Sequence, residues 1–63
     1  MALIRVHLLS GEVVELHDSE SVDQAYSTVA DAMRQGVELG GPTGGGTYVV
    51  IPGVQILYAE VQP

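Results

Sequence analysis

A nearly unbroken apolar run, residues 48–61, constrains the fold of this 63-residue chain more than any other feature. The run reads Tyr-Val-Val-Ile-Pro-Gly-Val-Gln-Ile-Leu-Tyr-Ala-Glu-Val. A strand with apolar side chains on both faces needs a cover on each face, and the single helix pattern in the chain can cover only one. We therefore expect the second cover to be another chain, a ligand or a partner.

The size of the chain points the same way. A domain this short buries roughly 60% of the surface that its unfolded chain exposes, so it is marginally stable alone. Disulfides, metals or oligomerisation usually compensate, and the absence of cysteine excludes disulfides and thiolate metal sites. We therefore expect one small domain, residues 1–63, that assembles with itself as a homodimer or higher oligomer.

The charge of the chain restricts its partners. Eight acidic residues against two arginines and no lysine give a net charge of −6. Such a chain repels a phosphate backbone and an anionic membrane surface, so we expect neither nucleic acid nor membrane as a partner. The acidity suits solubility, or a basic surface on another protein.

The N-terminal segment indicates the compartment. Its apolar start turns polar by His7, which is too short for a signal peptide or a membrane span. Together with the absence of cysteine, this predicts a cytoplasmic protein.

The first part of the chain predicts a β-hairpin. Residues 3–9 alternate in polarity, and residues 13–17 form a second strand candidate. A three-residue loop at 10–12, with Gly11 in the left-handed position, gives a strand pairing in which the polar side chains lie on one face and the apolar ones on the other. The cross-strand pairs expected from this loop are Val6–Leu16 and Leu8–Val14 inside, and Arg5–His17 and His7–Glu15 outside.

A helix is predicted over residues 21–35. Ser21 and Gln24 match a capping box, and Gly36 is a C-terminal stop signal. Apolar residues recur with helical spacing and predict the buried stripe Val22, Ala25, Tyr26, Val29 and Met33.

The remaining segments predict three further strands. Residues 37–39 are a short strand candidate, 40–46 form a glycine-rich loop, and 47–51 form a strand. Pro52-Gly53 interrupts the pattern before a last strand at 56–61. The order is ββαβββ, which predicts an α+β fold with one small antiparallel sheet and a helix packed on one face.

The last strand supplies the candidate interface. Val54, Ile56 and Tyr58 would share one face and Leu57, Ala59 and Val61 the other, and the sequence does not decide which face meets the helix. Tyrosine is enriched in interfaces because its large ring keeps a hydroxyl for a wet edge. The candidate interface residues are Tyr48, Val54, Ile56, Leu57, Tyr58 and Val61.

The glycine-rich loop, residues 40–47, supports an alternative function, an oligomeric binder or sequestrator of a small molecule or nucleotide. Glycine backbones can approach a phosphate closely, although the lysine and following helix of a phosphate loop are missing. The candidate ligand-binding residues are Arg34, Thr43, Gly44, Gly45, Gly46 and Thr47.

The sequence nominates no catalytic residue and no cofactor. His7 and His17 lack a third metal ligand at a diagnostic spacing, and no serine stands in a nucleophile-elbow context. We therefore expect a non-enzymatic protein without a metal. An enzyme that assembles a site around His7 or His17 across chains stays open as an alternative.

Residues 49–60, Val-Val-Ile-Pro-Gly-Val-Gln-Ile-Leu-Tyr-Ala-Glu, are similar to the ending of a known group of small proteins. The chain resembles short actinobacterial and phage proteins of unknown function whose last strand reads V-[VL]-[IV]-P-x-x-x-I-x-Y-x-E. The likeness spans residues 12 to 61, but the loop at 40–46 replaces a charged hairpin turn of those proteins. The resemblance implies a compact α+β interaction protein, encoded by a phage and able to bind a host macromolecule.

Overall fold

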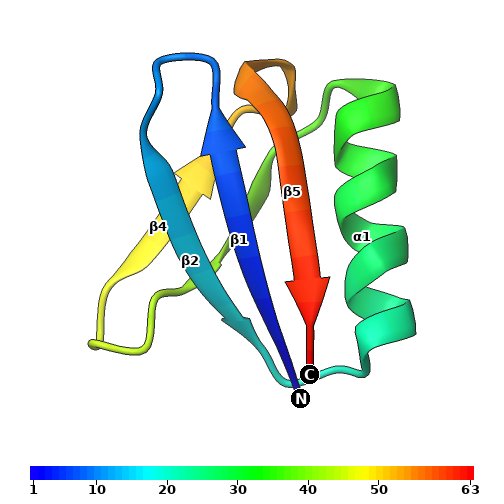
Figure 1. Ribbon diagram of the computed structural model, residues 1–63, viewed down its shortest axis with the longest axis vertical. Helices are drawn as coiled ribbons and strands as arrows, with labels where there is room; N and C mark the ends of the chain where they lie inside the picture. The colour runs from blue at the N-terminus through cyan, green and yellow to red at the C-terminus, as the bar shows by residue number, and fades with distance from the viewer.

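The strands of the protein divide into two antiparallel sheets in the computed structural model, which describes all 63 residues. One sheet has three strands in the order β2-β1-β5, and the other is the hairpin β3-β4 (Figure 1). The elements are β1 (Ala2–Leu8), β2 (Val13–Asp18), α1 (Val22–Gln35), β3 (Leu39–Pro42), β4 (Tyr48–Ile51), the 3-10 turn η1 (Gly53–Gln55) and β5 (Ile56–Gln62).

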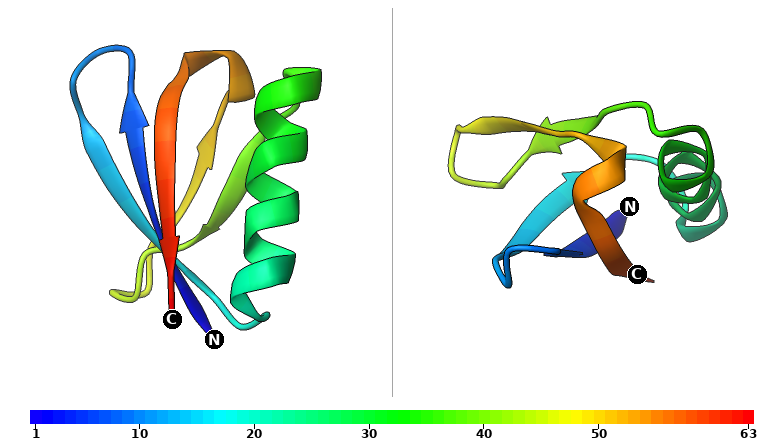
Figure 2. Two further views of the ribbon diagram at one scale, coloured as in Figure 1. Left: turned by 45° about the vertical axis from the view of Figure 1, so that its right-hand side comes forward. Right: turned by 90° about the horizontal axis from the view of Figure 1, so that it is seen from above.

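The predicted α+β class and the ββαβββ order are confirmed. The hairpin β3-β4 lies as a second layer over the three-stranded sheet, and α1 closes one side beside β5 (Figure 2). The strands do not join into one sheet because Pro52 and η1 turn the chain between β4 and β5. The third strand lies at Leu39–Pro42 instead of residues 37–39, so part of the predicted glycine-rich loop is strand.

The β1-β2 hairpin has a three-residue loop, but the predicted position of that loop was wrong. Leu8 N–H donates to the Glu12 carbonyl at 2.9 Å, so the loop is residues 9–11. In a three-residue loop the left-handed residue comes last, after a type I turn, and Gly11 has a φ of 96°. The register therefore moves by two residues. The observed pairs include Val6–Val14, Ile4–Leu16, Arg5–Glu15 and Leu3–His17.

The helix has the predicted ends. The Ser21 side chain accepts a hydrogen bond from Gln24 N–H at 3.2 Å, and Gly36 adopts the left-handed conformation with a φ of 70°. The predicted buried stripe was partly wrong, because the buried helix residues are Ala25, Val29 and Ala32. Tyr26 is 67% exposed and Met33 is also exposed.

A β-bulge at Leu57 decides which side chains of β5 face the core. Leu8 pairs with Ile56 and His7 pairs with Tyr58, so Leu57 has no partner on β1. An extra residue of this kind reverses the alternation along a strand. Neither of the two faces predicted for β5 contains the predicted set of residues. Ile56 is buried and Ala59 and Val61 pack against the core, whereas Leu57 and Tyr58 are exposed.

The core lies between the two sheets and the helix. It contains apolar side chains only, and these are Ala2, Ile4, Val6, Leu16, Ala25, Val29, Ala32, Leu39, Ile51 and Ile56. The backbone of η1 lies close to the end of α1 at Gly53, which is buried. A Cβ atom at Gly53 would overlap the carbonyl oxygens of Ala32 and Val37. Glycine there lets η1 sit directly on the end of α1.

Candidate functional site

One continuous stretch of the chain, residues 39–59, carries no charged side chain and no histidine, although the net charge is −6. We name it the uncharged ribbon. It forms β3, β4, η1 and the first half of β5. The predicted interface residues lie in it apart from Val61, which packs against the core. An apolar surface of another molecule that packs on the ribbon therefore meets no charged side chain of the ribbon.

The most exposed apolar side chains within the ribbon belong to β4. Tyr48 is 75% exposed and Val50 is 73% exposed. Both lie on the outer face of the hairpin, because Ile51 is buried and Val49 packs against the core. Val54, Leu57 and Tyr58 are also exposed, whereas Ile56, another predicted interface residue, is buried in the core of its own chain.

The composition of β3 explains why β4 is so exposed. Gly40 lies opposite Val50 and Pro42 lies opposite Tyr48, so the two large β4 side chains have little beside them on that face. Glycine is required at position 40, because a Cβ atom there would lie 2.9 Å from the Val49 carbonyl oxygen. The outer face of β4 is therefore apolar, and side chains of β3 do not cover it.

The residues predicted to bind a ligand do not form one site. Thr43 closes the hairpin tip, with its backbone N–H and its hydroxyl donating to the Thr47 carbonyl at 2.9 and 3.1 Å. Gly44 approaches the His17 ring, since a Cβ atom there would lie 2.7 Å from His17 Nε2. Gly44 and Gly46 have positive φ angles of 92° and 86°, whereas Gly45 does not.

Arg34 lies far from this tip. It is in the last turn of α1, at the end of the molecule opposite the hairpin tip (Figure 1). Its Nη1 atom contacts Asp31 Oδ1 at 2.6 Å. The structure therefore does not bring Arg34 together with the glycines, and the tip offers a phosphate no cationic partner from Arg34.

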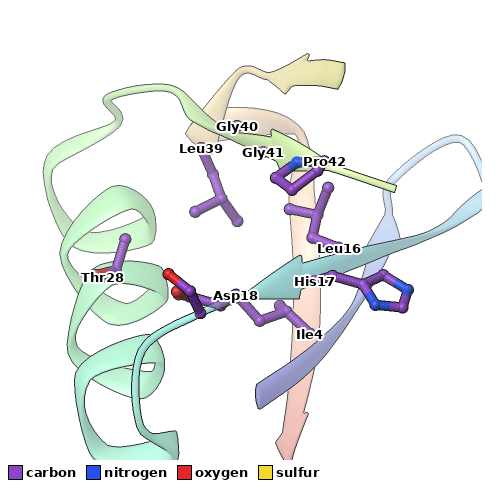
Figure 3. Close-up of a pocket in the computed structure, with 10 residues that line it drawn as sticks. Ile4, Leu16, His17, Asp18, Thr28, Leu39, Gly40, Gly41 and Pro42 are labelled. Atoms are coloured by element: carbon purple, nitrogen blue, oxygen red, sulfur yellow. The ribbon is translucent and has the colours of Figure 1, made fainter. Parts of the chain in front are cut away.

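A cavity of about 220 Å³ lies beside the tip, between β2, β3 and α1 (Figure 3). Leu16 and Leu39 form part of its apolar wall, and Gly40, Gly41 and Pro42 follow one rim. The other lining residues are Ile4, His17, Asp18, Ser19 and Thr28. Sequence reasoning missed this cavity because its walls come from four elements, β1, β2, α1 and β3, which meet only in the folded chain.

Two polar groups of the cavity already have partners. Asp18 Oδ1 accepts from the Glu20 N–H at 2.9 Å, and the Thr28 hydroxyl donates to the Gln24 carbonyl at 3.0 Å. The Asp18 carboxylate makes the cavity unfavourable for an anion because like charges repel. A neutral or cationic molecule suits the lining better than a nucleotide does.

The outer face of the three-stranded sheet carries the histidine that sequence reasoning considered for catalysis. His7 Nε2 lies 2.8 Å from Glu60 Oε1, and the His7 ring stacks on Tyr58 with centroids 4.1 Å apart. Arg5 pairs with Glu15 at 3.0 Å. The predicted His7–Glu15 and Arg5–His17 neighbours were wrong because the hairpin register differs by two residues. No group of three potential metal ligands occurs.

No family model matches the chain, and neither a curated protein nor a solved structure matches it. Its one long helix, 14 residues, is too short and too polar to cross a membrane.

Proposed function

We propose that this protein is a small acidic interaction module that assembles with itself through the uncharged ribbon. The observation that carries the proposal is β4, where Tyr48 and Val50 are about three-quarters exposed on a strand that pairs on one side only. Isolated exposed apolar residues are normal on protein surfaces. Neighbouring ones on a strand with one open edge are typical of a contact surface.

The distribution of charge supports self-association at this place. Two copies that each carry a net charge of −6 repel one another. Placing like charges opposite each other in an interface costs several kcal/mol. A contact between two uncharged ribbons avoids that cost, since the acidic residues then remain on the solvated outer faces.

Exposed ribbon residues outside β4, such as Val54 and Leu57, suit a role in binding another macromolecule after assembly, as the resemblance to the phage proteins implies. The proposed role is non-enzymatic and cytoplasmic. It needs neither nucleic acid nor membrane, because the ribbon is apolar and the rest of the chain is acidic.

The test is the mass in solution. Light scattering coupled to gel filtration, at micromolar concentration and physiological salt, should give a dimer or a higher multiple of the 6.6 kDa chain. A single species of 6.6 kDa across the accessible concentration range would contradict the proposal.

A second candidate, the binding of a small molecule, rests on the cavity beside β3. The sequence suggested residues 40–47 for this function, and Gly40, Gly41 and Pro42 of that stretch line the cavity. We expect a neutral or cationic ligand in place of a nucleotide, because the Asp18 carboxylate lies in the lining.

A thermal-shift screen with small amines, sugars and nucleotides tests this candidate, since a ligand that binds only the folded state raises its apparent stability. Gly41→Val should abolish any shift, because a Cβ atom at Gly41 meets nothing within 4 Å and would enter the cavity. Gly45→Val is the matched control, since Gly45 is equally unobstructed but lies at the hairpin tip. A shift that survives Gly41→Val would place the ligand elsewhere.

A further inference from the structure

We infer that two copies of the chain pair through β4, antiparallel and related by a two-fold axis at Val49, to form a four-stranded sheet β3-β4-β4-β3. The inference rests on the proposed self-assembly and specifies its interface and register. It follows from which backbone groups of β4 are free, from the residues on each strand edge, and from the distribution of charge.

The free backbone groups of β4 follow from its pairing with β3. Thr43 N–H donates to the Thr47 carbonyl, so this pair lies at a hydrogen-bonded position of the ladder. Hydrogen-bonded and non-hydrogen-bonded pairs alternate in an antiparallel ladder. The next hydrogen-bonded pair is therefore Gly41–Val49. The N–H and C=O groups of Tyr48 and Val50 then point away from β3, toward the open edge.

Each of the other edge strands carries a residue that discourages pairing. The outward position of β3 holds Pro42, which has no N–H to donate. The other edges belong to β2, which carries Glu15 and Asp18, and to β5, which carries Glu60 and has α1 beside it (Figure 1). Charges and prolines are the usual protection of an edge strand. The sequence of β4, Tyr-Val-Val-Ile, has neither.

The outward groups of β4 belong to Tyr48 and Val50, and a two-fold axis at Val49 is the symmetric register that pairs both of them within the strand. Tyr48 then lies opposite the partner's Val50. With the axis at Val50, Tyr48 would meet Pro52, which has no N–H to donate. With the axis at Tyr48, Val50 would meet Gly46, which lies outside β4. The axis at Val49 gives two hydrogen-bonded pairs, with Val49 opposite the partner's Val49. It also sets each exposed tyrosine ring beside a β-branched side chain, a favourable cross-strand combination. β4 pairs with β3 alone, so no strand of the same chain occupies its other edge.

The absence of cysteine makes the register testable by single-cysteine oxidation. At the axis, the two Val49 Cα atoms would lie about 4.5 Å apart as a non-hydrogen-bonded pair, which a disulfide can span. Two copies of residue 50 would be diagonal neighbours, roughly 7–8 Å apart, which is too far. Val49→Cys should give a covalent dimer on mild oxidation, and Val50→Cys should not. Equal crosslinking by both variants, or by Val50→Cys alone, would overturn the register.

A pair of matched charge substitutions tests the interface independently of any crosslink. Val50→Asp and Val54→Asp alter exposed valines of the uncharged ribbon by the same change, but only position 50 lies on β4. In the proposed dimer, Val50→Asp sets two carboxylates near each other across the axis. We expect Val50→Asp to be monomeric by light scattering, with an unchanged circular dichroism spectrum, and Val54→Asp to assemble like the parent.

The outcomes separate the inference from the proposed function. A parent protein that is monomeric contradicts both. A parent that assembles, together with a Val50→Asp variant that still assembles, contradicts only the β4 interface. Loss of assembly in Val54→Asp with assembly retained in Val50→Asp would place the contact on η1 instead.

Discussion

Replacement of Gly53 by alanine tests how the last third of the chain is held to the helix. The side chain of alanine would overlap two backbone oxygens, those of Ala32 and Val37, because η1 sits on the end of α1. Gly53 does not have a positive φ, so the effect is steric. Forcing extra atoms into a packed region costs typically 1–3 kcal/mol. We expect about 3 kcal/mol here, since neither neighbour is a side chain that can rotate away.

That loss is large for a protein of this size. A chain of 63 residues has a free energy of unfolding of roughly 3–9 kcal/mol. For domains of this length each kcal/mol shifts the midpoint by about 4–8 °C, so Gly53→Ala should lower it by roughly 12–24 °C. The measurement is urea and thermal unfolding by circular dichroism at one fixed protein concentration, because assembly makes the midpoint concentration-dependent.

Gly41→Ala is the matched control. A Cβ atom at Gly41 meets nothing within 4 Å, and its φ is not positive. Alanine at such a site stabilises by about 0.4–1 kcal/mol, because it restricts the unfolded chain. If Gly53→Ala unfolds within about 0.5 kcal/mol of the parent, the close contact between η1 and α1 is refuted, since surface substitutions alone have effects of that size.

Four further substitutions test other parts of the fold by urea unfolding. Ser21→Ala should cost about 1 kcal/mol, because it removes the acceptor for the Gln24 N–H, and no change would refute the cap. Leu16→Ala should cost about 2–5 kcal/mol as a buried core residue, whereas Val13→Ala on the same strand is exposed and should cost less than about 0.5 kcal/mol. Equal effects at the two positions would contradict the facing of β2. Tyr26→Ser should change the free energy of unfolding by less than about 0.5 kcal/mol, because Tyr26 is exposed. A loss as large as that expected for Leu16→Ala would show that Tyr26 is buried, as its spacing in the helix predicted.

The features that could be predicted from the sequence depend on neighbours in the chain. The helix begins and ends where Ser21 and Gly36 indicated, since capping interactions span only a few residues. Gly11 marked the left-handed position of the first hairpin for the same reason. Alternating polarity identified the faces of β1 and β2, and the two-residue error in register left those faces intact because strands repeat every two residues.

The features that could not be predicted depend on partners elsewhere in the fold. In the run around Leu57 both faces are apolar, so no pattern of polarity reveals a bulge, and only the pairing with β1 places it there. Tyr26 fitted the helical stripe by spacing, but the small residues Ala25 and Ala32 face the core because the sheet lies close to the helix. The residues predicted to bind a ligand do not form one site, because Arg34 and the hairpin tip lie at opposite ends of the molecule.

The bulge also changes where the excess apolar surface lies. The sequence suggested that β5 was apolar on both faces, but the bulge turns Ile56, Ala59 and Val61 together toward the core. Two apolar residues of β5, Leu57 and Tyr58, remain exposed, and Tyr58 is partly covered by the His7 ring. The apolar surface that still needs a cover from outside the chain is therefore mainly on β4.

The composition of the β3-β4 hairpin makes an incidental exposure of β4 difficult to accept. On β3, Pro42 removes an outward donor, so that edge is protected against pairing. Protection of β4 would need only one charged residue or proline, and the exposed positions Tyr48 and Val50 could hold a charge without disturbing the core. The strand instead places a tyrosine and a valine there, in a chain that has ten charged residues, eight acidic and two basic, outside the uncharged ribbon. Two edges of one hairpin, one protected and one open, are the arrangement expected when the open edge has a partner.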